Sequence, residues 1–238
     1  MVSQSRWAQF SFTDNDSLLD ALVARIAMQL RKGIALRSVA SLAVSGGRTP
    51  EPLLRRLAAE ELDWSRVKVT LTDERWVPDD HADSNARLVH NTLFQGDARQ
   101  AEFIPLYQAG ADPYIAAPAV NARLQQLALP LDVVVLGMGD DGHTASWFPG
   151  AAELDRALQA PDEERCCAIT PPTAAHSRMT LTLPMVLKAR LLLLYIVGQN
   201  KLQTLQRAKV DGPVEELPVR ALLHQSETAL QIYFAEQQ

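Results

Sequence analysis

The sequence lacks several features that would assign it to particular protein classes. It has only two cysteines, Cys166 and Cys167, and a bridge between adjacent cysteines is disfavoured. A secreted scaffold held together by disulfides is therefore excluded, and we expect a reducing compartment, the cytoplasm. The longest aliphatic block, residues 191–197, is far too short to cross a bilayer, and residues 1–7 have no apolar core of signal-peptide length. We expect no membrane attachment.

A surplus of basic residues is also missing. The chain has 23 lysines and arginines against 28 acidic residues, for a net charge of -5. Because a phosphate backbone requires a basic face, we expect no nucleic-acid partner, whereas a small anionic ligand needs only a few local cations. The length of 238 residues fits one large domain or two small ones. No linker rich in Gly, Ser or Pro divides the chain, so we expect one domain over residues 1–238, as a monomer or small homo-oligomer.

Short apolar runs alternate along the chain with segments of helical spacing. The runs expected as strands are residues 39–44, 67–71, 102–106, 131–136, 166–169, 179–183, 191–197 and 229–234. The segments expected as helices are residues 14–37, 50–60, 85–94, 113–127, 151–159, 200–208 and 219–224. This alternation predicts an α/β fold with a mostly parallel Rossmann-like sheet and helices on both faces. Loops that follow parallel strands converge on one crevice, where ligands bind.

The loop Gly137-Met-Gly-Asp-Asp-Gly-His-Thr-Ala-Ser-Trp-Phe-Pro-Gly150 is the most informative stretch. It follows an expected strand and carries His143, whose unperturbed pKa lies near 6.5, beside Asp141 and Thr144. A titratable imidazole on a glycine-rich loop after a strand predicts an acid/base site. The alternative is a structural histidine that holds the loop by hydrogen bonds.

The same loop satisfies the dinucleotide pattern G-x-G-x-x-G over residues 137–142. Three physical reasons argue against that interpretation. Asp140 and Asp141 would face a pyrophosphate, and Pro149-Gly150 cuts short the helix that should follow. The motif also falls on a middle strand, whereas the fingerprint belongs to the first βα turn. We therefore expect no nicotinamide cofactor.

The loop after the strand at 39–44 reads Ser45-Gly46-Gly47-Arg-Thr49-Pro50. Two glycines let the backbone approach a ligand closely, and the helix that starts near Pro50 presents free N–H groups. With the hydroxyls of Ser45 and Thr49, this loop is suited to a phosphate or a polyhydroxyl group. The alternative is an ordinary strand-to-helix turn.

Residues 72–78 form a third loop of this kind, after the strand at 67–71. Arg75 can bind a carboxylate, a phosphate or a developing oxyanion, and Asp73 can orient a base or accept sugar hydroxyls. For this loop alone, the alternative is a surface ion pair of Asp and Arg that caps a turn. Three such loops after three strands favour a shared site.

Two further cations are candidates for binding an anion. Arg178 opens the strand expected near 179–183, and Lys201 lies in the first turn of the helix expected near 200–208. A lysine there opposes the helix dipole, and a bound anion would relieve that clash.

Neither a metal centre nor an acyl-enzyme serine is indicated by the sequence. The remaining histidines, which lack metal-ligand spacing, are His81, His90, His176 and His224. No Cys/His cluster suggests zinc, and neither Ser45 nor Ser146 lies in a G-x-S-x-G elbow. We expect metal-free, non-covalent chemistry without a cofactor.

These motifs, in this order and spacing, resemble the 6-phosphogluconolactonase family of the glucosamine/galactosamine-6-phosphate isomerase superfamily. The motifs are residues 45–50, 73–78, 84–85, 137–150 and 178–182. The resemblance implies a NagB/RpiA-like fold and a hydrolase of carbohydrate metabolism. Its reaction converts 6-phosphoglucono-δ-lactone to 6-phosphogluconate in the oxidative pentose phosphate pathway. Arg48 stands where that family often has a small residue, so we do not count it as a ligand contact.

The resemblance also suggests roles for the candidates. His143 is the expected general base, held by Asp141 or Asp73. Arg75 and the N–H groups near Gly46 and Gly47 are expected to bind the oxyanion or the sugar hydroxyls. Arg178 and Lys201 are expected to bind the 6-phosphate, and Ser45, Thr49 and Thr144 the rest of the substrate.

Two alternatives remain open. Glucosamine-6-phosphate deaminases share the pocket, but their loop tends to continue into Phe-Asn-Glu-Pro, whereas this chain reads Ser146-Trp-Phe-Pro149 and has no acid there. A non-catalytic sugar-phosphate sensor would use the same fold, but it usually carries an output domain that this sequence does not indicate.

Overall fold

The computed structural model describes residues 6–237 and contains a seven-stranded sheet in which every neighbouring pair is parallel. The strand order is β1-β10-β9-β6-β2-β3-β5. The strands are β1 (Trp7–Asp14), β2 (Ala40–Val44), β3 (Val67–Leu71), β5 (Glu102–Ile104), β6 (Val133–Leu136), β9 (Leu192–Val197) and β10 (Leu230–Gln237). The predicted mostly parallel sheet is confirmed, and the expected strands occur within a few residues of their predicted bounds.

Helices connect these strands. Each helix predicted from spacing is present, and the helix Leu183–Leu187 is an additional one that was not predicted. The helices are α1 (Asn15–Arg37), α2 (Pro50–Ala58), α3 (Asn85–Thr92), α4 (Pro113–Leu124), α5 (Leu154–Leu158), α6 (Leu183–Leu187), α7 (Gln199–Lys209) and α8 (Arg220–Leu223). Short 3-10 turns occur at Trp64–Arg66 and Gly96–Gln100. Side-chain caps start several helices; Asp14, for example, accepts the N–H of Ser17 at 2.8 Å in front of α1.

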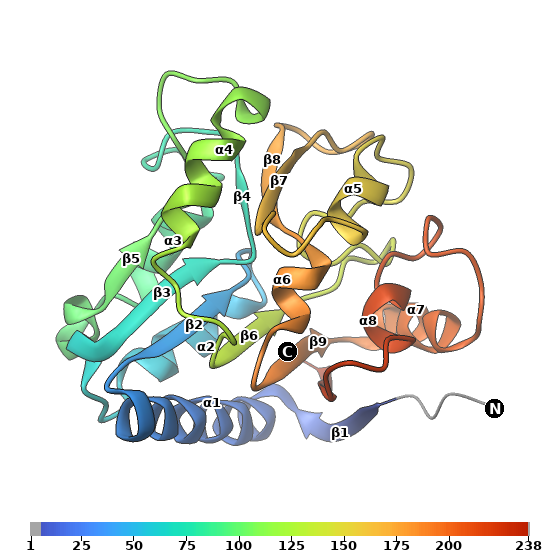
Figure 1. Ribbon diagram of the computed structural model, residues 1–238. Coiled ribbons are helices and arrows are strands. Elements are labelled where there is room, and N and C mark those ends of the chain that lie inside the picture. The colour runs from blue at the N-terminus through green and yellow to red at the C-terminus, as the bar shows by residue number, and fades with distance from the viewer. Residues whose placement is uncertain (1–5, 238) are drawn as a thin grey trace.

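The direction of the crossovers sorts the helices onto the two faces of the sheet. Connections between parallel strands are right-handed, so α1, α2 and α3, which lead toward β5, lie on one face. The helices α4, α6, α7 and α8 belong to connections that run the other way and lie on the opposite face. α1 packs against α2, and α7 packs against β9 and β10. Figure 1 shows α1 along the bottom of the view and α7 with α8 at the right.

A second, antiparallel sheet of three strands was not predicted. Its order is β4 (Asp73–Arg75), β8 (Arg178–Leu181) and β7 (Cys166–Ile169). Figure 1 shows it standing above the end of β3, next to α4. The strand expected at 179–183 ends at Leu181, because Thr182 accepts the N–H of Met185 and caps α6. Residues 73–75, expected in a loop, pair with 178–180, so Arg75 lies opposite Arg178.

Continuous apolar strands form the centre of the core, as expected for a parallel sheet covered on both faces. Every residue of β2, β6 and β9 is buried. Asp132, which interrupts the apolar run before β6, is buried beside Arg37 and accepts the N–H of Ser41 at 3.0 Å. Because Arg37 balances the charge of Asp132, the apolar run that leads into β6 can still pack in the core.

The remaining whole-chain predictions concern the cysteines and the membrane. Cys166 and Cys167 are unbridged and buried, and burial raises the pKa of both thiols. Among the described residues, no helix is both long and apolar enough to span a bilayer.

Candidate active site

A cavity of about 240 Å³ opens where β9, β6, β2 and β3 end. The chain leaves β2 toward β3 and leaves β6 toward β9, so the cavity sits at the switch point of the sheet, where ligands bind in this architecture. The predicted site residues in its wall are Ser45, Gly46, Gly47, Thr49, Asp73, Arg75, His143 and Lys201. Asp141, Thr144 and Arg178 are not part of the wall.

Ser45 ties together the strand ends beneath the cavity. Its hydroxyl donates to the carbonyl of Val135 at 3.1 Å and shares a hydrogen bond with the Thr72 hydroxyl at 2.8 Å. The N–H of Gly137 donates to Oγ of Ser45 at 3.3 Å. The ends of β2, β3 and β6 are thereby held in one fixed arrangement.

The two glycines after Ser45 are required by the local geometry. A Cβ on Gly46 would overlap the side-chain amide of Asn85, and Gly47 has a φ of 99°. L-residues rarely adopt that backbone conformation. This sharp turn brings the backbone of the loop against Asn85 and places Thr49 and Pro50, at the start of α2, in the cavity wall.

Asp73 and Arg75 reach the cavity from β4. Asp73 is buried, and its carboxylate accepts the hydroxyl of Ser146 at 2.6 Å. Its carbonyl accepts the side-chain amide of Asn85 at 2.8 Å. The guanidinium of Arg75 donates to the carbonyl of Asp83 at 2.6 Å. The bonds to Ser146 and Asp83 fix both side chains.

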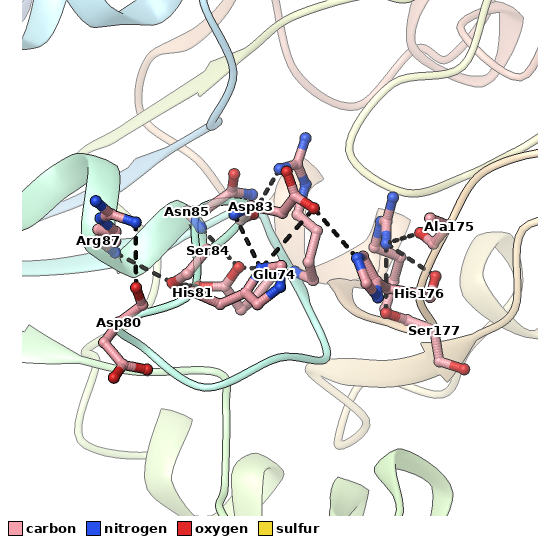
Figure 2. Close-up of polar contacts among 12 residues, drawn as sticks. Glu74, Asp80, His81, Asp83, Ser84, Asn85, Arg87, Ala175, His176 and Ser177 are labelled. Carbon is pink, nitrogen blue, oxygen red and sulfur yellow. Dashed lines mark hydrogen bonds and ion pairs between the residues drawn. The ribbon is translucent and has the colours of Figure 1, made fainter.

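Glu74 lies between these residues and is completely buried. Its carboxyl group accepts the N–H groups of Arg75, Asn85 and Ala86 at 2.7–2.8 Å, and Figure 2 shows it close to Ser84 and Asn85, where α3 starts. Burial raises the pKa of Glu74 to about 7, although these three hydrogen bonds favour the charged form. Glu74 therefore positions Arg75 and Asn85 and does not reach the cavity wall itself.

His143 is held by Asp141, and Asp73 is not its hydrogen-bond partner. Nδ1 of His143 lies 2.6 Å from Oδ1 of Asp141, which also accepts the His143 backbone N–H at 3.1 Å. Burial opposes the charge on Asp141, but the contacts with His143 outweigh it, so the pKa of Asp141 lies below its usual value. A proton on Nδ1 leaves Nε2 as the basic nitrogen. No described residue hydrogen-bonds Nε2.

Phe148 packs against the imidazole of His143, and Arg178 lies next to Phe148. The Phe148 ring lies 4.4 Å from the His143 ring, centroid to centroid, and the Arg178 guanidinium lies 6.0 Å from the Phe148 centroid. Arg178 is buried and donates to the carbonyls of Ala175 and His176 at 2.6 and 2.8 Å. Burial lowers the pKa of this guanidinium. Arg178 lies outside the cavity wall, and its predicted contact with the substrate phosphate stays a prediction.

Lys201 and Arg48 add positive charge to the wall. Nζ of Lys201 donates to the carbonyl of Met138 at 2.6 Å and lies 3.3 Å from Oδ1 of Asp140. The Arg48 side chain is exposed and, within the part of the chain that the structure describes, its guanidinium makes no hydrogen bond or ion pair. Arg48, which was not counted as a ligand contact, is therefore a cation of the cavity wall.

The loop at 137–150 does not have the geometry of a dinucleotide site. Between residues 137 and 153, all of which the structure describes, no helix follows the glycines. Thr144 is buried and donates to the carbonyl of Gly137 at 2.8 Å, so its hydroxyl closes the loop on itself.

Two further residues in the wall, Asn85 and Tyr195, were not predicted as site residues, although residues 84–85 are among the motifs of the resemblance. Asn85 follows Ser84 at the start of α3, and only the packing of that helix against the Gly46 turn brings it to the cavity. Tyr195 belongs to the apolar strand β9, and its hydroxyl donates to Asn15 at 2.7 Å.

The profile of the family described as glucosamine-6-phosphate isomerases/6-phosphogluconolactonase matches residues 13–231. The chain belongs to this family. Within the family, it is 48% identical over 202 residues to the 6-phosphogluconolactonase of Pseudomonas aeruginosa, covering 85% of each chain. It is 43% identical over 224 residues to that of Rhizobium meliloti, covering 94% of this chain and 97% of the relative.

A solved structure from the same family confirms the fold. The crystal structure of a 6-phosphogluconolactonase from Shewanella baltica matches with a TM-score of 0.92 and 39% identity, and the match covers 99% of both chains. The resemblance inferred from the loop motifs and the NagB/RpiA-like fold are therefore confirmed.

Proposed function

We propose that this protein is a 6-phosphogluconolactonase, which hydrolyses 6-phospho-D-glucono-1,5-lactone to 6-phospho-D-gluconate in the oxidative pentose phosphate pathway. One observation carries the proposal: an imidazole oriented by a carboxylate shares a cavity wall with three cations. The imidazole is His143, and the cations are Arg48, Arg75 and Lys201. The names of the relatives in Pseudomonas aeruginosa and Rhizobium meliloti support the same substrate.

The reaction needs one base and one stabilised oxyanion. Nε2 of His143 removes a proton from water as the hydroxide oxygen bonds to C1 of the lactone. The resulting tetrahedral intermediate collapses when the bond between C1 and the ring oxygen breaks. The imidazolium then returns its proton to the ring oxygen, and the new carboxyl group ionises. Asp141 stabilises the imidazolium between these two steps.

The cations divide between the two ends of the substrate. Arg75 and the N–H groups near Gly46 and Gly47 bind the oxyanion at C1 or the sugar hydroxyls. Lys201 and Arg48 bind the 6-phosphate. We assign Arg178 to positioning, because its guanidinium already serves two backbone carbonyls outside the wall.

The loop after His143 favours the lactonase over the deaminase. Ser146 is buried with its hydroxyl on Asp73, and the buried indole of Trp147 donates to the carbonyl of Leu181 at 2.9 Å. Both side chains are thus occupied by contacts within the protein. Residues 144–150 contain no carboxylate that could assist ring opening or isomerisation. Lactone hydrolysis does not require such a group.

The test is the release of acid from freshly prepared 6-phosphogluconolactone at constant pH, corrected for spontaneous hydrolysis. The lactonase predicts catalysed acid release and no ammonia from glucosamine 6-phosphate. Ammonia release would support the deaminase instead. Tight binding of the phosphosugar without turnover of either substrate would support a sensor.

We extend the proposal to the organisation of the protein. Residues 1–238 form one sugar-phosphate domain, acting in the cytoplasm as a monomer or small homo-oligomer without a cofactor. Sedimentation of the purified chain tests the oligomeric state.

A further inference from the structure

Two loops at the edge of the active-site cavity bring together three side chains that the reaction does not use. His81 and Asp83 lie in the loop of residues 78–84, which leads into α3, and His176 lies in the loop of residues 170–177, which leads into β8. Asp83 and His176 are 93 positions apart in the sequence. Figure 2 shows the first loop on one side and His176 on the other, joined through Asp83.

The side-chain ligand atoms of these residues converge. Nε2 of His176 lies 3.2 Å from Oδ2 of Asp83, and Nδ1 of His81 lies 3.8 Å from the same oxygen. Ligand atoms from all three residues lie within 4.8 Å of one another. Among the described residues, this is the one group of three His, Cys, Asp or Glu side chains close enough to share a metal ion.

The hydrogen bonds within the cluster do not explain why Nδ1 of His81 faces the Asp83 carboxylate. The backbone N–H of Asp83 donates to Nδ1 of His81 at 3.1 Å, so Nδ1 carries a lone pair and no proton. This electron-rich nitrogen faces the carboxylate of Asp83 without a proton between them. A cation placed there would attract both groups, and, because Asp83 is an exposed residue, water could then accept its N–H.

The geometry and the donor set point to zinc. A tetrahedral zinc ion, with bonds of about 2.0–2.2 Å to imidazole nitrogen and carboxylate oxygen, separates its ligands by about 3.3 Å. The separations of 3.2 and 3.8 Å from the Asp83 carboxylate lie within about 0.5 Å of that value. The two imidazole nitrogens lie within 4.8 Å of each other and have to move closer together. Two imidazoles with one carboxylate suit zinc, whereas magnesium and calcium prefer oxygen ligands.

The surrounding backbone is held in the required place by the two arginines of the small sheet. Arg75 donates to the carbonyl of Asp83, and Arg178 donates to the carbonyl of His176. His176 has a φ of 66°, in the left-handed region that residues other than glycine adopt only uncommonly. Such backbone strain persists only where the surrounding structure imposes it.

We propose that His81, Asp83 and His176 form a zinc site that joins these two loops, with solvent in the fourth position of the ion. The site is separate from the His143–Asp141 pair and serves to brace the edge of the cavity. It differs from the expectation that the remaining histidines bind no metal. Linear spacing does not reveal it, because its ligands come from two distant segments.

The experiment titrates zinc into the metal-stripped, full-length protein against a chromophoric chelator. We expect one zinc ion per chain, with binding at least about tenfold weaker in Asp83→Asn and His176→Asn, since loss of even an outer-shell partner costs a metal site that much. Asparagine tolerates the left-handed backbone at His176, so the variant should fold. Circular dichroism checks its folding.

Two controls separate this site from other histidines. His143→Ala removes the active-site imidazole and His90→Gln removes an exposed histidine on α3, and both should bind zinc as the wild type does. Crystals grown with zinc should show an anomalous peak between the two loops. Zinc binding lost in His143→Ala but retained in His176→Asn, a peak beside Asp141, or no binding at all would overturn the proposal.

Discussion

Nδ1 of His143 lies 2.6 Å from Oδ1 of Asp141, only two residues earlier in the chain. Gly142, with a φ of 80°, provides the turn between them, and Gly139 leaves room for both side chains. Gly139 and Gly142 therefore let the imidazole fold onto the carboxylate of the same loop. The same pattern that resembles a dinucleotide fingerprint has a different physical purpose here.

Asp141→Asn should lower kcat for the phosphorylated lactone by roughly 10²-fold, within the range that a positioned base contributes. The amide can present an N–H to Nδ1 and thereby favour the tautomer in which Nε2 carries the proton. KM should change little, since Asp141 lies outside the cavity wall. Steady-state kinetics on the fresh lactone provide the measurement.

Asp155→Asn is the matched control, because it removes an exposed carboxylate from α5. It should leave kcat within about twofold of the wild type. An equal loss in both variants would mean that net charge, and not the contact with His143, is responsible.

Gly139→Ala should lower kcat while the protein remains folded. A Cβ at this position would overlap the imidazole of His143 and crowd the Asp141 carboxylate. Both groups are ends of side chains and can move away, so we expect the contact to break and the fold to survive. Adding Asp141→Asn to this variant should cost little more, because the two changes remove the same contact. Fully additive losses would contradict this account.

Lys201→Ala should raise KM for 6-phosphogluconolactone by about tenfold or more, since a hydrogen bond to a charged group is worth about 1.5–3 kcal/mol. KM for unphosphorylated gluconolactone should stay within about twofold. Lys188→Ala, at the opposite edge of the sheet where the chain enters β6, is the control and should affect neither substrate. Equal effects of Lys201→Ala on both lactones would remove the phosphate contact from the proposal.

Glu74 predicts how stability depends on pH. Its pKa rises from an ordinary value of 4.5 to about 7 on folding, so the folded state binds the proton more tightly than the unfolded chain. The contribution of this group is fully present below about pH 4.5 and is lost as the pH rises through about 7. Glu74→Gln removes this titration and leaves a buried backbone N–H facing the new amide.

Urea unfolding at pH 5 and pH 8 should therefore show the larger stability gap between the wild type and Glu74→Gln at pH 5. A gap that widens toward pH 8 would mean that the buried group is held as the carboxylate by its three N–H donors.

Much of the main sheet could be predicted because its central strands are continuous apolar runs that end in glycine-containing loops. Two strands of the small sheet, β7 and β8, were also predicted as strands. Their pairing with β4 was not, since β4 consists of Asp73, Glu74 and Arg75, and charged residues give no strand pattern. These residues form a strand because their backbone pairs with β8, which lies about a hundred positions later. Only tertiary structure determines such a pairing.

The site shows the same division. Ser45, Asp73 and His143 could be placed together from sequence, because parallel strands end at one edge of the sheet. The choice between Asp141 and Asp73 as the partner of His143 depends on side-chain directions within a folded loop, which no spacing rule supplies. Asn85 reaches the cavity only through helix packing.

The most direct test of the central claim is kcat of His143→Ala on freshly prepared 6-phosphogluconolactone, corrected for spontaneous hydrolysis. If His143 is the general base, kcat falls by roughly 10²–10⁴-fold while KM changes by only a few-fold. A kcat near the wild-type value would show that another group activates the water and would contradict the proposed mechanism.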